Sequence, residues 1–496
     1  MSEIEERIAE LERNGLGRRL RMVSGPQGPT VLLDGRPVLL LCSNNYLGLA
    51  NHPRVREAAA EAAMRWGVGA GASRLVSGTM TIHRRLEEGL AAFERSEACL
   101  LFGSGYLANI GVIEALAGHG DTIFSDELNH ASIVDGCRLS RAEVVVYRHG
   151  DVEHLDWILS HHRDRRNAHA GRMIVTDSVF SMDGDLAPLP EIVELANVHG
   201  ARTMVDEAHA LGAIGPDGRG AIAHAGLEGE IDVVVGTLGK ALGSYGAYVC
   251  ADDATVRYLI NTARALIFST APPPPAVAAA LAALELLKER PHRVERLQSN
   301  ARVLRRALAL EGFPVPEQGT HIVPLIVGEE RAASRLCHEA IERGVFAQAI
   351  RPPTVPAGTS RLRLAAMASH TPAELQRAAG ALGESARAIG LDPADIGPPV
   401  TEREIPTLEP VLAEPKLEPF IPELEPDAAI AALEAELDAG RERLAAAVRS
   451  RSPSPFDAER MSDAPVPRAS RSSVEPSIEP SAPFDFERET AAPRAA

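Results

Sequence analysis

The sequence predicts an α/β protein built on a mostly parallel, seven-stranded sheet with helices on both faces. Short apolar runs alternate with helical stretches, a pattern that is typical of parallel sheets covered by helices. The length of 496 residues is enough for two or three domains with a large core. The seven apolar runs are Ala98–Phe102, Thr122–Phe124, Val144–Tyr147, Met173–Thr176, Thr203–Val205, Val233–Val235 and Ala247–Cys250.

The composition excludes several classes of protein. A formal net charge of −17 argues against nucleic-acid binding. The five cysteines are scattered and form no CxxC pair, which argues against a disulfide framework or a structural zinc and favours a reducing compartment. The N-terminus is a charged amphipathic segment, and no apolar run approaches the ~18 residues of a membrane span. We therefore expect a cytoplasmic protein that binds no metal, membrane or nucleic acid.

The N-terminal part is predicted to contain a helix over residues 2–20, a hairpin over 30–41 that turns at Asp34-Gly35, and a second helix over 53–66. Four consecutive prolines from Pro272 then separate the sheet from a long Ala/Leu-rich helix and a smaller α+β region. The predicted divisions are an N-terminal helix and hairpin segment, 1–45, a large domain, 46–275, a small C-terminal domain, 276–392, and a tail, 393–496.

The tail is rich in Pro, Glu, Ser and Ala. Its repeated Glu-Pro steps cannot build a helix or a strand ladder, so most of it is expected to be disordered. Within it, residues 427–449 place apolar side chains near one helical face, although Gly440 interrupts the pattern. A marginal isolated helix is the expectation there, and a docking or oligomerisation helix is the alternative.

Candidate binding residues follow the ends of the predicted strands, where ligands bind in sheets of this kind. Gly105 and Tyr106 open a helix after the first run, and the N–H groups of a helix N-terminus suit a phosphate, although most glycine-rich turns are merely turns. His130 follows the second run and could stack on a planar ligand or carry protons, although a lone histidine is more often structural.

Two later strand ends carry acids. Residues 177–185 combine hydroxyls and carboxylates, as a binding loop or a solvated turn would. Asp206 directly follows the fifth run, where a buried carboxylate needs a partner such as a protonated heterocycle, although Asp is also a common helix N-cap. His209 is three residues further on and could reach the same ligand.

Lys240 stands in a glycine-rich turn after the run Val233–Val235. Burial there would lower the pKa of its ammonium group and leave free amine, which can attack a carbonyl. A solvated lysine beside a flexible loop is the alternative for this stretch alone. Phosphate donors, a ring that can stack, an acid and an amine at the ends of one sheet together suit pyridoxal 5'-phosphate, PLP, with Asp206 facing the pyridine nitrogen.

A strand over residues 361–364 carries two arginines among apolar neighbours. An arginine in such a strand is suited to a carboxylate or phosphate ligand, although an edge-strand charge would look the same. The pattern does not decide between Arg361 and Arg363.

Several ordered motifs resemble those of the α-oxoamine synthases, a family of fold-type-I PLP enzymes. The resemblance covers roughly residues 1–385 and does not extend to the tail. The family condenses a small amino acid with an acyl thioester and loses carbon dioxide. The motifs are Asn44–Gly48, Gly71–Gly78, Asn129–Ser132, Phe180–Asp185, Asp206–His209 and Gly236–Lys240.

The resemblance implies a role for each candidate residue. Lys240 binds the cofactor covalently and moves the α-proton of the amino acid. Asp206 faces the pyridine nitrogen, His209 the phenolic oxygen, and His130 stacks on the ring. Other cofactor contacts implied are Gly105, Tyr106, Ser181 and Thr237, with Ser269 or Thr270 reaching a phosphate across a homodimer interface. The implied substrate contacts are Arg18, Asn44, His130, Thr354 and Arg363, with Arg361 as the rival of Arg363.

Within the family, residues 348–364 most resemble the branch of the biotin pathway, whose substrates are L-alanine and a pimeloyl thioester of coenzyme A or of a carrier protein. A sister synthase that uses glycine or serine with another acyl donor shares the same cofactor residues. A non-catalytic scaffold is a third hypothesis, but such a chain would be expected to lose Lys240 or Asp206.

Overall fold

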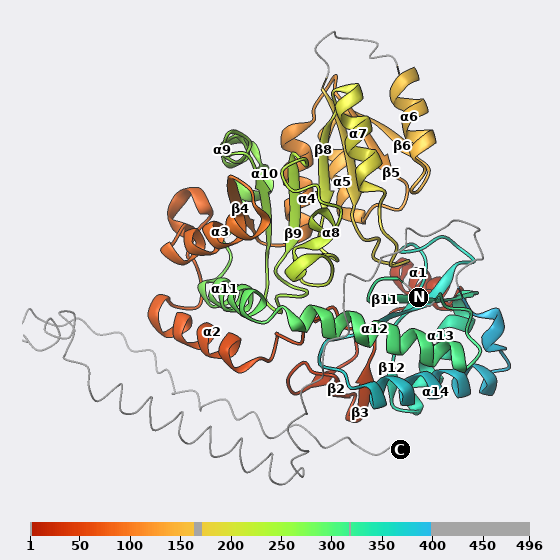
Figure 1. The fold of residues 1–496 in the computed structure, drawn as a ribbon. Helices are drawn as coiled ribbons and strands as arrows, with labels where there is room; N and C mark the ends of the chain where they lie inside the picture. The colour runs from red at the N-terminus through yellow and green to blue at the C-terminus, as the bar shows by residue number, and fades with distance from the viewer. Residues whose placement is uncertain (1, 163–170, 317–318, 398–496) are drawn as a thin grey trace, which may run out of the picture. The chain divides into compact units, whose positions relative to one another are not determined.

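The computed structural model describes residues 2–162, 171–316 and 319–397. Residues 398–496 of the predicted tail, including the helix proposed for 427–449, lie outside the described residues, whereas 393–397 are described. Figure 1 shows the fold as a ribbon, with a large sheet and its helices next to a second group of strands and helices. None of the helices within the described ranges is long and apolar enough to cross a membrane.

The large sheet confirms the predicted seven strands. Its spatial order is β4-β10-β9-β8-β7-β5-β6. All neighbouring pairs are parallel except those of β10, which runs antiparallel to β4 and β9. The strands are β4 (Ala98–Phe102), β5 (Thr122–Asp126), β6 (Glu143–Tyr147), β7 (Arg172–Asp177), β8 (Arg202–Asp206), β9 (Val233–Thr237) and β10 (Ala247–Ala251).

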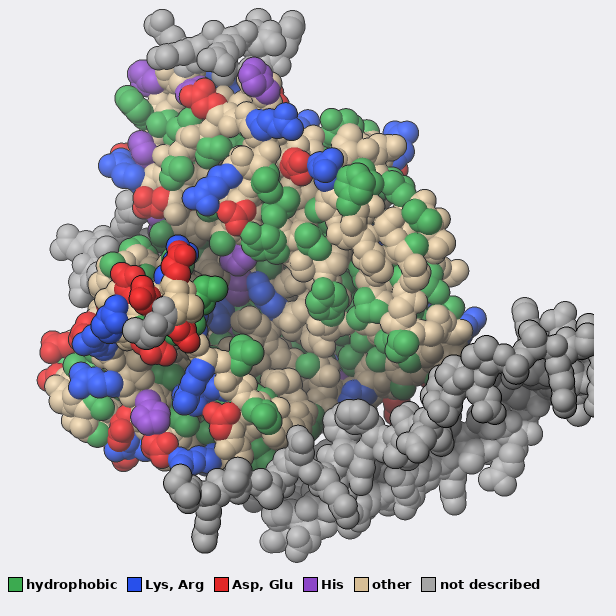
Figure 2. Space-filling model, turned by 180° about the vertical axis from the view of Figure 1, so that it is seen from behind, with side chains coloured by type: hydrophobic (Ala, Val, Ile, Leu, Met, Phe, Trp, Pro, Cys, Tyr) green, Lys and Arg blue, Asp and Glu red, His purple; other side chains and the backbone are tan. Residues whose placement is uncertain are grey.

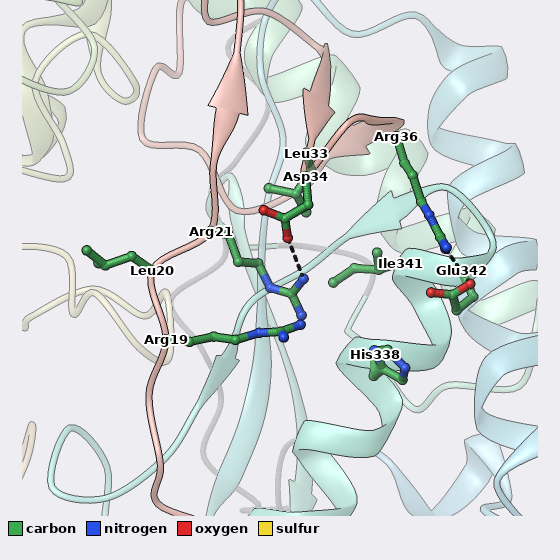
Figure 3. Close-up of a pocket in the computed structure, with 9 residues that line it drawn as sticks. All are labelled: Arg19, Leu20, Arg21, Leu33, Asp34, Arg36, His338, Ile341 and Glu342. Atoms are coloured by element: carbon green, nitrogen blue, oxygen red, sulfur yellow. Dashed lines mark hydrogen bonds and ion pairs between the residues drawn. The ribbon is translucent and has the colours of Figure 1, made fainter. Parts of the chain in front are cut away.

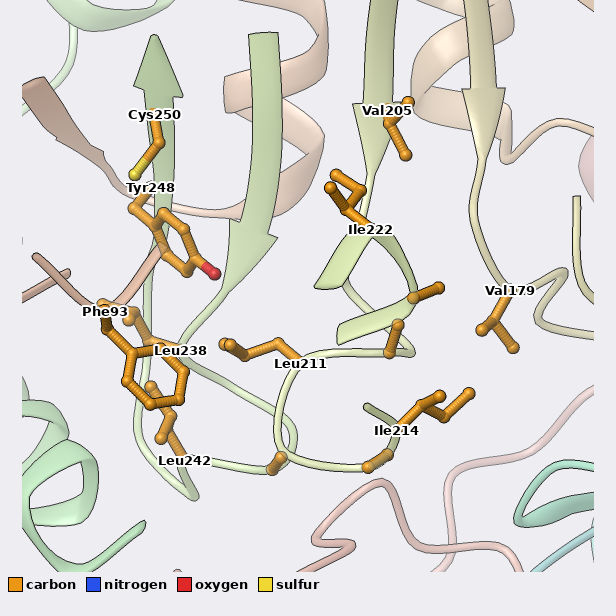
Figure 4. Packing of buried hydrophobic residues seen from close by; sticks show 14 of the residues in the cluster. Phe93, Val179, Val205, Leu211, Ile214, Ile222, Leu238, Leu242, Tyr248 and Cys250 are labelled. Carbon is orange, nitrogen blue, oxygen red and sulfur yellow. The ribbon is translucent and has the colours of Figure 1, made fainter. Parts of the chain in front are cut away.

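Both faces of this sheet are buried under helices. On β10, Tyr248 and Cys250 belong to one apolar cluster and Val249 to another, because alternate side chains of a strand point to opposite faces. Figure 4 shows the first cluster, in which Tyr248 and Leu238 pack near Phe93. One face is covered by α3 (Thr81–Glu94), α6 (Val152–His161), α7 (Leu189–His199) and α11 (Pro274–Glu289), and the other by α4 (Gly105–Leu116), α5 (Ala131–Ser140), α9 (Asp253–Thr262) and α10 (Arg264–Ile267).

A second apolar core joins the N-terminal hairpin to the C-terminal strands. Strand β3 of the hairpin pairs in parallel with β12, so segments about 300 residues apart in sequence share one sheet. A three-stranded sheet, β11-β14-β13, lies in the same core. These strands are β1 (Val23–Ser24), β2 (Thr30–Leu33), β3 (Arg36–Leu40), β11 (Ile322–Gly328), β12 (Val345–Phe346), β13 (Ala349–Ile350) and β14 (Ser360–Ala365).

Of the two helices predicted in the N-terminal part, one is confirmed and the other is shorter than predicted. The hairpin turns at Asp34-Gly35 as predicted, and α2 (Pro53–Trp66) has the predicted bounds. The predicted helix over 2–20 is wrong beyond residue 13, because α1 (Glu3–Arg13) ends before Gly15, whose φ of +70° stops the helix. The remaining helices are α8 (Gly220–His224), α12 (His292–Leu310), α13 (Glu330–Glu342) and α14 (Pro372–Ala388).

The last described residues belong to the second core and set the limit for a truncation. Ile396 is 2% exposed and packs in that core. Deleting residues 398–496 is therefore expected to leave kcat and KM nearly unchanged, because the removed sequence has a composition that does not build a core. Steady-state kinetics of the truncated and full-length proteins check this, and a large loss of activity would assign the tail a function.

Candidate functional site

The carboxyl ends of the central strands bring the predicted catalytic residues together. Asp177 and Asp206 end β7 and β8 and are direct neighbours in the sheet. Lys240 follows β9, the next strand along. Figure 2 shows a hollow in one face of the molecule in which histidine and basic side chains gather.

Lys240 is half-buried among charged groups. Burial lowers the pKa of its ammonium group to about 8, against the opposing effect of Asp206 and Asp177. About a tenth of this amine is therefore unprotonated at pH 7, far more than for an ordinary lysine, as a nucleophile or base requires. The turn that carries it requires Gly243, whose φ is +60° and whose Cβ would lie 2.3 Å from the backbone nitrogen of Ala50.

Asp206 is buried and held by two hydrogen bonds. The Asn109 side-chain amide donates to Oδ2 at 2.7 Å, and the Ala208 N–H donates to Oδ1 at 2.8 Å. Within the described ranges no ion pair is formed by this carboxylate, which is only 5% exposed. A buried carboxylate of this kind is suited to a cationic ligand group such as a protonated ring nitrogen.

His130 lies beside these acids and is partly open to solvent, although protein atoms surround much of its ring. Its backbone N–H donates to Asp177 Oδ2 at 2.7 Å, and its Nδ1 lies 2.7 Å from the hydroxyl of Ser132. The pKa of its ring is lowered, first by burial and then by Lys240, with Asp206 opposing. Burial and the adjacent Asp206 raise the pKa of Asp177 well above its ordinary value. The imidazole is therefore expected to be neutral at pH 7 and free to stack on a planar ligand.

His209 belongs to a hydrogen-bonded network with Tyr46 and Arg363. Its Nδ1 lies 2.7 Å from the hydroxyl of Tyr46 and 3.4 Å from Nη2 of Arg363. Because a guanidinium only donates, Nδ1 must accept and the proton must lie on Nε2. Burial lowers the pKa of the ring well below its ordinary value. His209 thus presents a neutral Nε2–H donor.

The two rival arginines of β14 have different surroundings. Arg361 forms an ion pair with the carboxylate of Asp183, so its charge is neutralised. Arg363 is only 6% exposed and bonds to neutral groups alone among the described residues. These are the carbonyl of Ser181, Oδ1 of Asn44 at 3.1 Å, the hydroxyl of Tyr46 at 3.1 Å and Nδ1 of His209. Arg363 therefore has charge available for an anionic ligand.

The N-terminus of α4 lies at the end of β4. The Ser104 side chain caps it by accepting from the Leu107 N–H at 3.3 Å. The N–H groups of the first helical turn have no acceptor within the helix. A Cβ added at Gly105 would meet nothing within 4 Å, so there is room in front of them. The hydroxyl of Tyr106 is instead turned to the carboxylate of Asp135.

The remaining predicted residues are less closely joined to Lys240. Ser181 lies near the site through its carbonyl contact with Arg363. The hydroxyl of Thr237 accepts from the Gly239 N–H at 3.3 Å within the same turn. Thr270 is exposed and pairs through its backbone with Ser73, and Ser269 precedes it.

The two predicted acyl contacts lie together in another part of the chain. Arg18 donates to the carbonyl of Pro352 at 2.9 Å, and Thr354 is exposed two residues further on. Neither side chain is hydrogen-bonded to Lys240 within the described part of the chain. Their role as acyl contacts therefore stays a prediction.

A second hollow lies away from the predicted catalytic residues. Figure 3 shows it, with a volume of about 420 Å³, between the segment Arg19–Arg21 and α13. Two of its arginines are already paired, Arg21 with Asp34 at 3.2 Å and Arg36 with Glu342 at 2.6 Å. It contains neither Lys240 nor any side chain that the sequence predicts to act in catalysis.

Sequence reasoning missed several members of the site. Asn109 could have been noticed as one of the few polar residues of an apolar helix, and Tyr46 lies in a quoted motif but received no role. His321 packs edge-on against Tyr46, with ring centroids 4.1 Å apart, and burial lowers its pKa to about 3. No sequence signal distinguished His321, because its neighbours come from distant segments.

Comparison with known proteins identifies the family. Residues 36–382 match the aminotransferase class I and II family. The chain is 52% identical over 387 residues to the 8-amino-7-oxononanoate synthase of Geobacter sulfurreducens, which covers 77% of this chain and 98% of that protein. The corresponding synthase of Thermoanaerobacter pseudethanolicus is 48% identical, with coverage of 76% and 94%. This chain belongs to the 8-amino-7-oxononanoate synthase family.

Solved structures agree with this assignment. A serine palmitoyltransferase from S. paucimobilis with bound PLP-myriocin is 34% identical, with a TM-score of 0.74 and coverage of 78% of this chain and 98% of that one. An 8-amino-7-oxononanoate synthase from Francisella tularensis is 26% identical, with a TM-score of 0.60 and coverage of 71% and 98%. The predicted α-oxoamine synthase resemblance, the fold-type-I fold and the PLP cofactor are confirmed for this synthase family member.

The described residues fit PLP. The buried carboxylate of Asp206, which forms no ion pair with a described residue, suits a protonated pyridine nitrogen. The N–H groups at the start of α4 have space in front of them and suit a phosphate. The amine of Lys240 suits an aldehyde. No group of three or more His, Cys, Asp or Glu side chains that could hold a metal ion is found among the described residues.

Proposed function

We propose that this chain condenses L-alanine with a pimeloyl thioester to form 8-amino-7-oxononanoate, carbon dioxide and a free thiol, a step of biotin biosynthesis. The observation that carries the proposal is the convergence of Lys240, Asp206 and Arg363. Asp206 and Lys240 lie at the carboxyl ends of the neighbouring strands β8 and β9, and Arg363 hydrogen-bonds to His209, three residues after Asp206. Identities of 46–52% to 8-amino-7-oxononanoate synthases over most of the chain support the reaction.

The cofactor supplies an electron sink that holds the negative charge left when a bond to the α-carbon of the amino acid breaks. Lys240 would bind it covalently, Asp206 would face its pyridine nitrogen, and His209 Nε2–H would donate to its phenolic oxygen. His130 would stack on the ring, and the start of α4 at Gly105 and Tyr106 would hold the phosphate. Ser181, Thr237, Ser269 and Thr270 complete the proposed contacts.

Side chains of the protein would carry out proton transfer and substrate binding. The Nζ amine of Lys240, with a pKa of about 8, would take the α-proton of alanine and later return a proton to the product. The guanidinium of Arg363 would bind the carboxylate of alanine with Asn44 beside it, because its present partners are all neutral. His130, neutral and next to Asp206, would shape the space in which the thioester carbonyl lies.

The acyl side of the reaction rests on Arg18 and Thr354, which we propose contact the pimeloyl donor. We also propose a cytoplasmic homodimer, in which Ser269 or Thr270 of one subunit serves the site of the other. From the sequence we expect that the protein binds neither nucleic acid nor a membrane.

A sister synthase is the alternative, because serine palmitoyltransferase structures match with TM-scores up to 0.74. Their identity to this chain is 34–36%, lower than the 46–52% identity to the curated 8-amino-7-oxononanoate synthases of Geobacter sulfurreducens and other bacteria, but higher than the 26% identity to the solved Francisella tularensis synthase. The two activities would share Lys240, Asp206 and His209 and would differ in the acyl slot and in the amino acid accepted.

A matrix of donors and amino acids tests the proposal. Alanine, glycine and serine are each combined with pimeloyl-, acetyl-, succinyl- and palmitoyl-CoA on PLP-loaded protein, and released thiol is measured. The highest kcat/KM is expected for alanine with pimeloyl-CoA. A maximum with glycine or serine and another donor would contradict the proposed reaction while leaving the family unchanged.

Replacing Arg363 with lysine is expected to raise the KM for alanine by about 10- to 100-fold, because lysine keeps the charge but loses the two-pronged contact with a carboxylate. Arg361→Lys is the matched control, since its side chain already pairs with Asp183. Steady-state kinetics with varied alanine decide between them. A larger effect from Arg361→Lys would reverse the assignment of the carboxylate site.

A further inference from the structure

Residues 180–185 form a tight turn between the two groups of strands. The turn is closed by two backbone bonds, from the Gly184 N–H to the Phe180 carbonyl at 2.8 Å and from the Phe180 N–H to the Asp185 carbonyl at 3.0 Å. It follows β7, so it begins at the carboxyl end of the large sheet beside Asp177. We call it the 180–185 turn.

One side of the 180–185 turn contacts β14 and the start of β11. Arg363 donates from Nε to the carbonyl of Ser181, and Arg361 pairs with Asp183. The Thr320 hydroxyl donates to the carbonyl of Gly184 at 2.6 Å. The orientation of Arg363 therefore depends on where the 180–185 turn lies.

The other side of the 180–185 turn is held by His149, which follows β6. Its Nδ1 lies 3.0 Å from Oδ1 of Asp126, and its Nε2 lies 2.6 Å from Oδ2 of Asp185. Carboxylates only accept, so both ring nitrogens donate and the ring is an imidazolium. Burial acts against this charge, but the two carboxylates raise the pKa of the ring to about 10.

One of the two carboxylates, that of Asp126, is itself held by backbone groups, and the ring has a further contact with the 180–185 turn. Asp126 ends β5 and also accepts from the N–H groups of Leu128 and Gly150, each at 2.9 Å. The His149 ring meets Phe180, the first residue of the 180–185 turn, edge to face with ring centroids 4.3 Å apart. His149 therefore ties the turn to the large sheet through both its first and its last residue.

We propose that His149 is a positioning residue for amino-acid binding, which clamps the 180–185 turn between Asp126 and Asp185 and thereby orients Arg363 toward the substrate carboxylate. This inference rests on the proposed function, in which Arg363 binds that carboxylate. The side-chain contacts of His149 with Asp126, Asp185 and Phe180 do not include Lys240, so its effect on the site would pass through the turn.

The test uses the full-length, PLP-loaded protein and two variants. His149→Phe keeps a ring against Phe180 but removes both bonds to carboxylates, and the milder Asp185→Asn removes the charge of one partner. The matched control is His199→Phe, which breaks another histidine–aspartate pair, 3.1 Å from Asp156 on the helices α6 and α7. Melting temperature, cofactor absorbance and the KM for each substrate are measured for all four proteins.

Both test variants are expected to raise the KM for alanine, His149→Phe by about tenfold, a loss of about 1.4 kcal/mol of binding. The KM for the thioester and the cofactor absorbance should stay within about twofold of the parent, as should every value of His199→Phe. Equal rises in both KM values, or a lower melting temperature with an unchanged KM for alanine, would overturn the inference. Failure of the parent protein to use alanine and pimeloyl-CoA would instead overturn the proposed function.

Discussion

Lys240→Ala is expected to abolish turnover, with a loss of about 10⁴-fold or more, while the protein remains folded. The variant removes both the proposed covalent attachment of the cofactor and the base that takes the α-proton, and a positioned base alone contributes about 10²–10⁴-fold. The fold should survive because the Lys240 side chain forms no hydrogen bond or ion pair with any described residue, and loss of a half-buried charge relieves its desolvation.

The chain offers an unusually clear control for this prediction, since it contains only the lysines Lys240, Lys288 and Lys416. Lys288→Ala removes a lysine of α11 whose amine donates to the carbonyl of Gly89 at 3.3 Å, and it should keep full activity. Borohydride reduction of the PLP-loaded protein, followed by peptide mass mapping, should label Lys240 alone. A label on another lysine, or measurable turnover by Lys240→Ala, would contradict the proposed mechanism.

The sheet could be predicted from sequence because most of its strands are buried on both faces and therefore form continuous apolar runs, as β10 shows. The edge strand β6 is an exception, since Val144 and Val146 are exposed, but its run of three valines still gives the strand signal. The position of the site followed from the rule that ligands bind beyond the carboxyl ends of such strands. Asp206, His130 and Lys240 were found in this way, and the structure places them after the carboxyl ends of β8, β5 and β9 in the same sheet.

The choice between Arg361 and Arg363 could not be predicted. Residues two apart in a strand share a face, so periodicity treats them alike. Their surroundings decide, and Asp183 and Asn44, the residues that distinguish them, lie 178 and 319 positions away in the chain. The role of His149 could not be predicted for the same reason. A single histidine after a strand carries no sequence signal of a role, and only the folded chain brings Asp126 and Asp185 to its two ring nitrogens.

Asp206→Asn is expected to lower kcat by about 10³-fold, comparable with the removal of a preorganised electrostatic contact. The carboxylate would keep the pyridine nitrogen of the cofactor protonated, and a neutral amide cannot. The substitution also disturbs the local bonding. Asp206 accepts from Asn109 at one oxygen and from the Ala208 N–H at the other, so the new amide nitrogen would face a donor. We therefore expect a loss of about 1–3 kcal/mol in the free energy of unfolding as well.

A double variant separates the two effects. In Asp206→Asn with Asn109→Asp, the new amide can donate to the new carboxylate, so the hydrogen bond between the two positions is restored while the negative charge moves to α4. Stability should largely recover and kcat should not, because the charge no longer faces the ring nitrogen. Asp232→Asn is the matched control: Asp232 accepts from the Thr203 N–H and hydroxyl at 2.7 and 3.0 Å and immediately precedes β9, at the opposite end of the sheet. Asp232→Asn should cost stability but leave kcat unchanged. If the double variant regained activity along with stability, Asp206 would be a structural residue, and its assignment to the cofactor would be wrong.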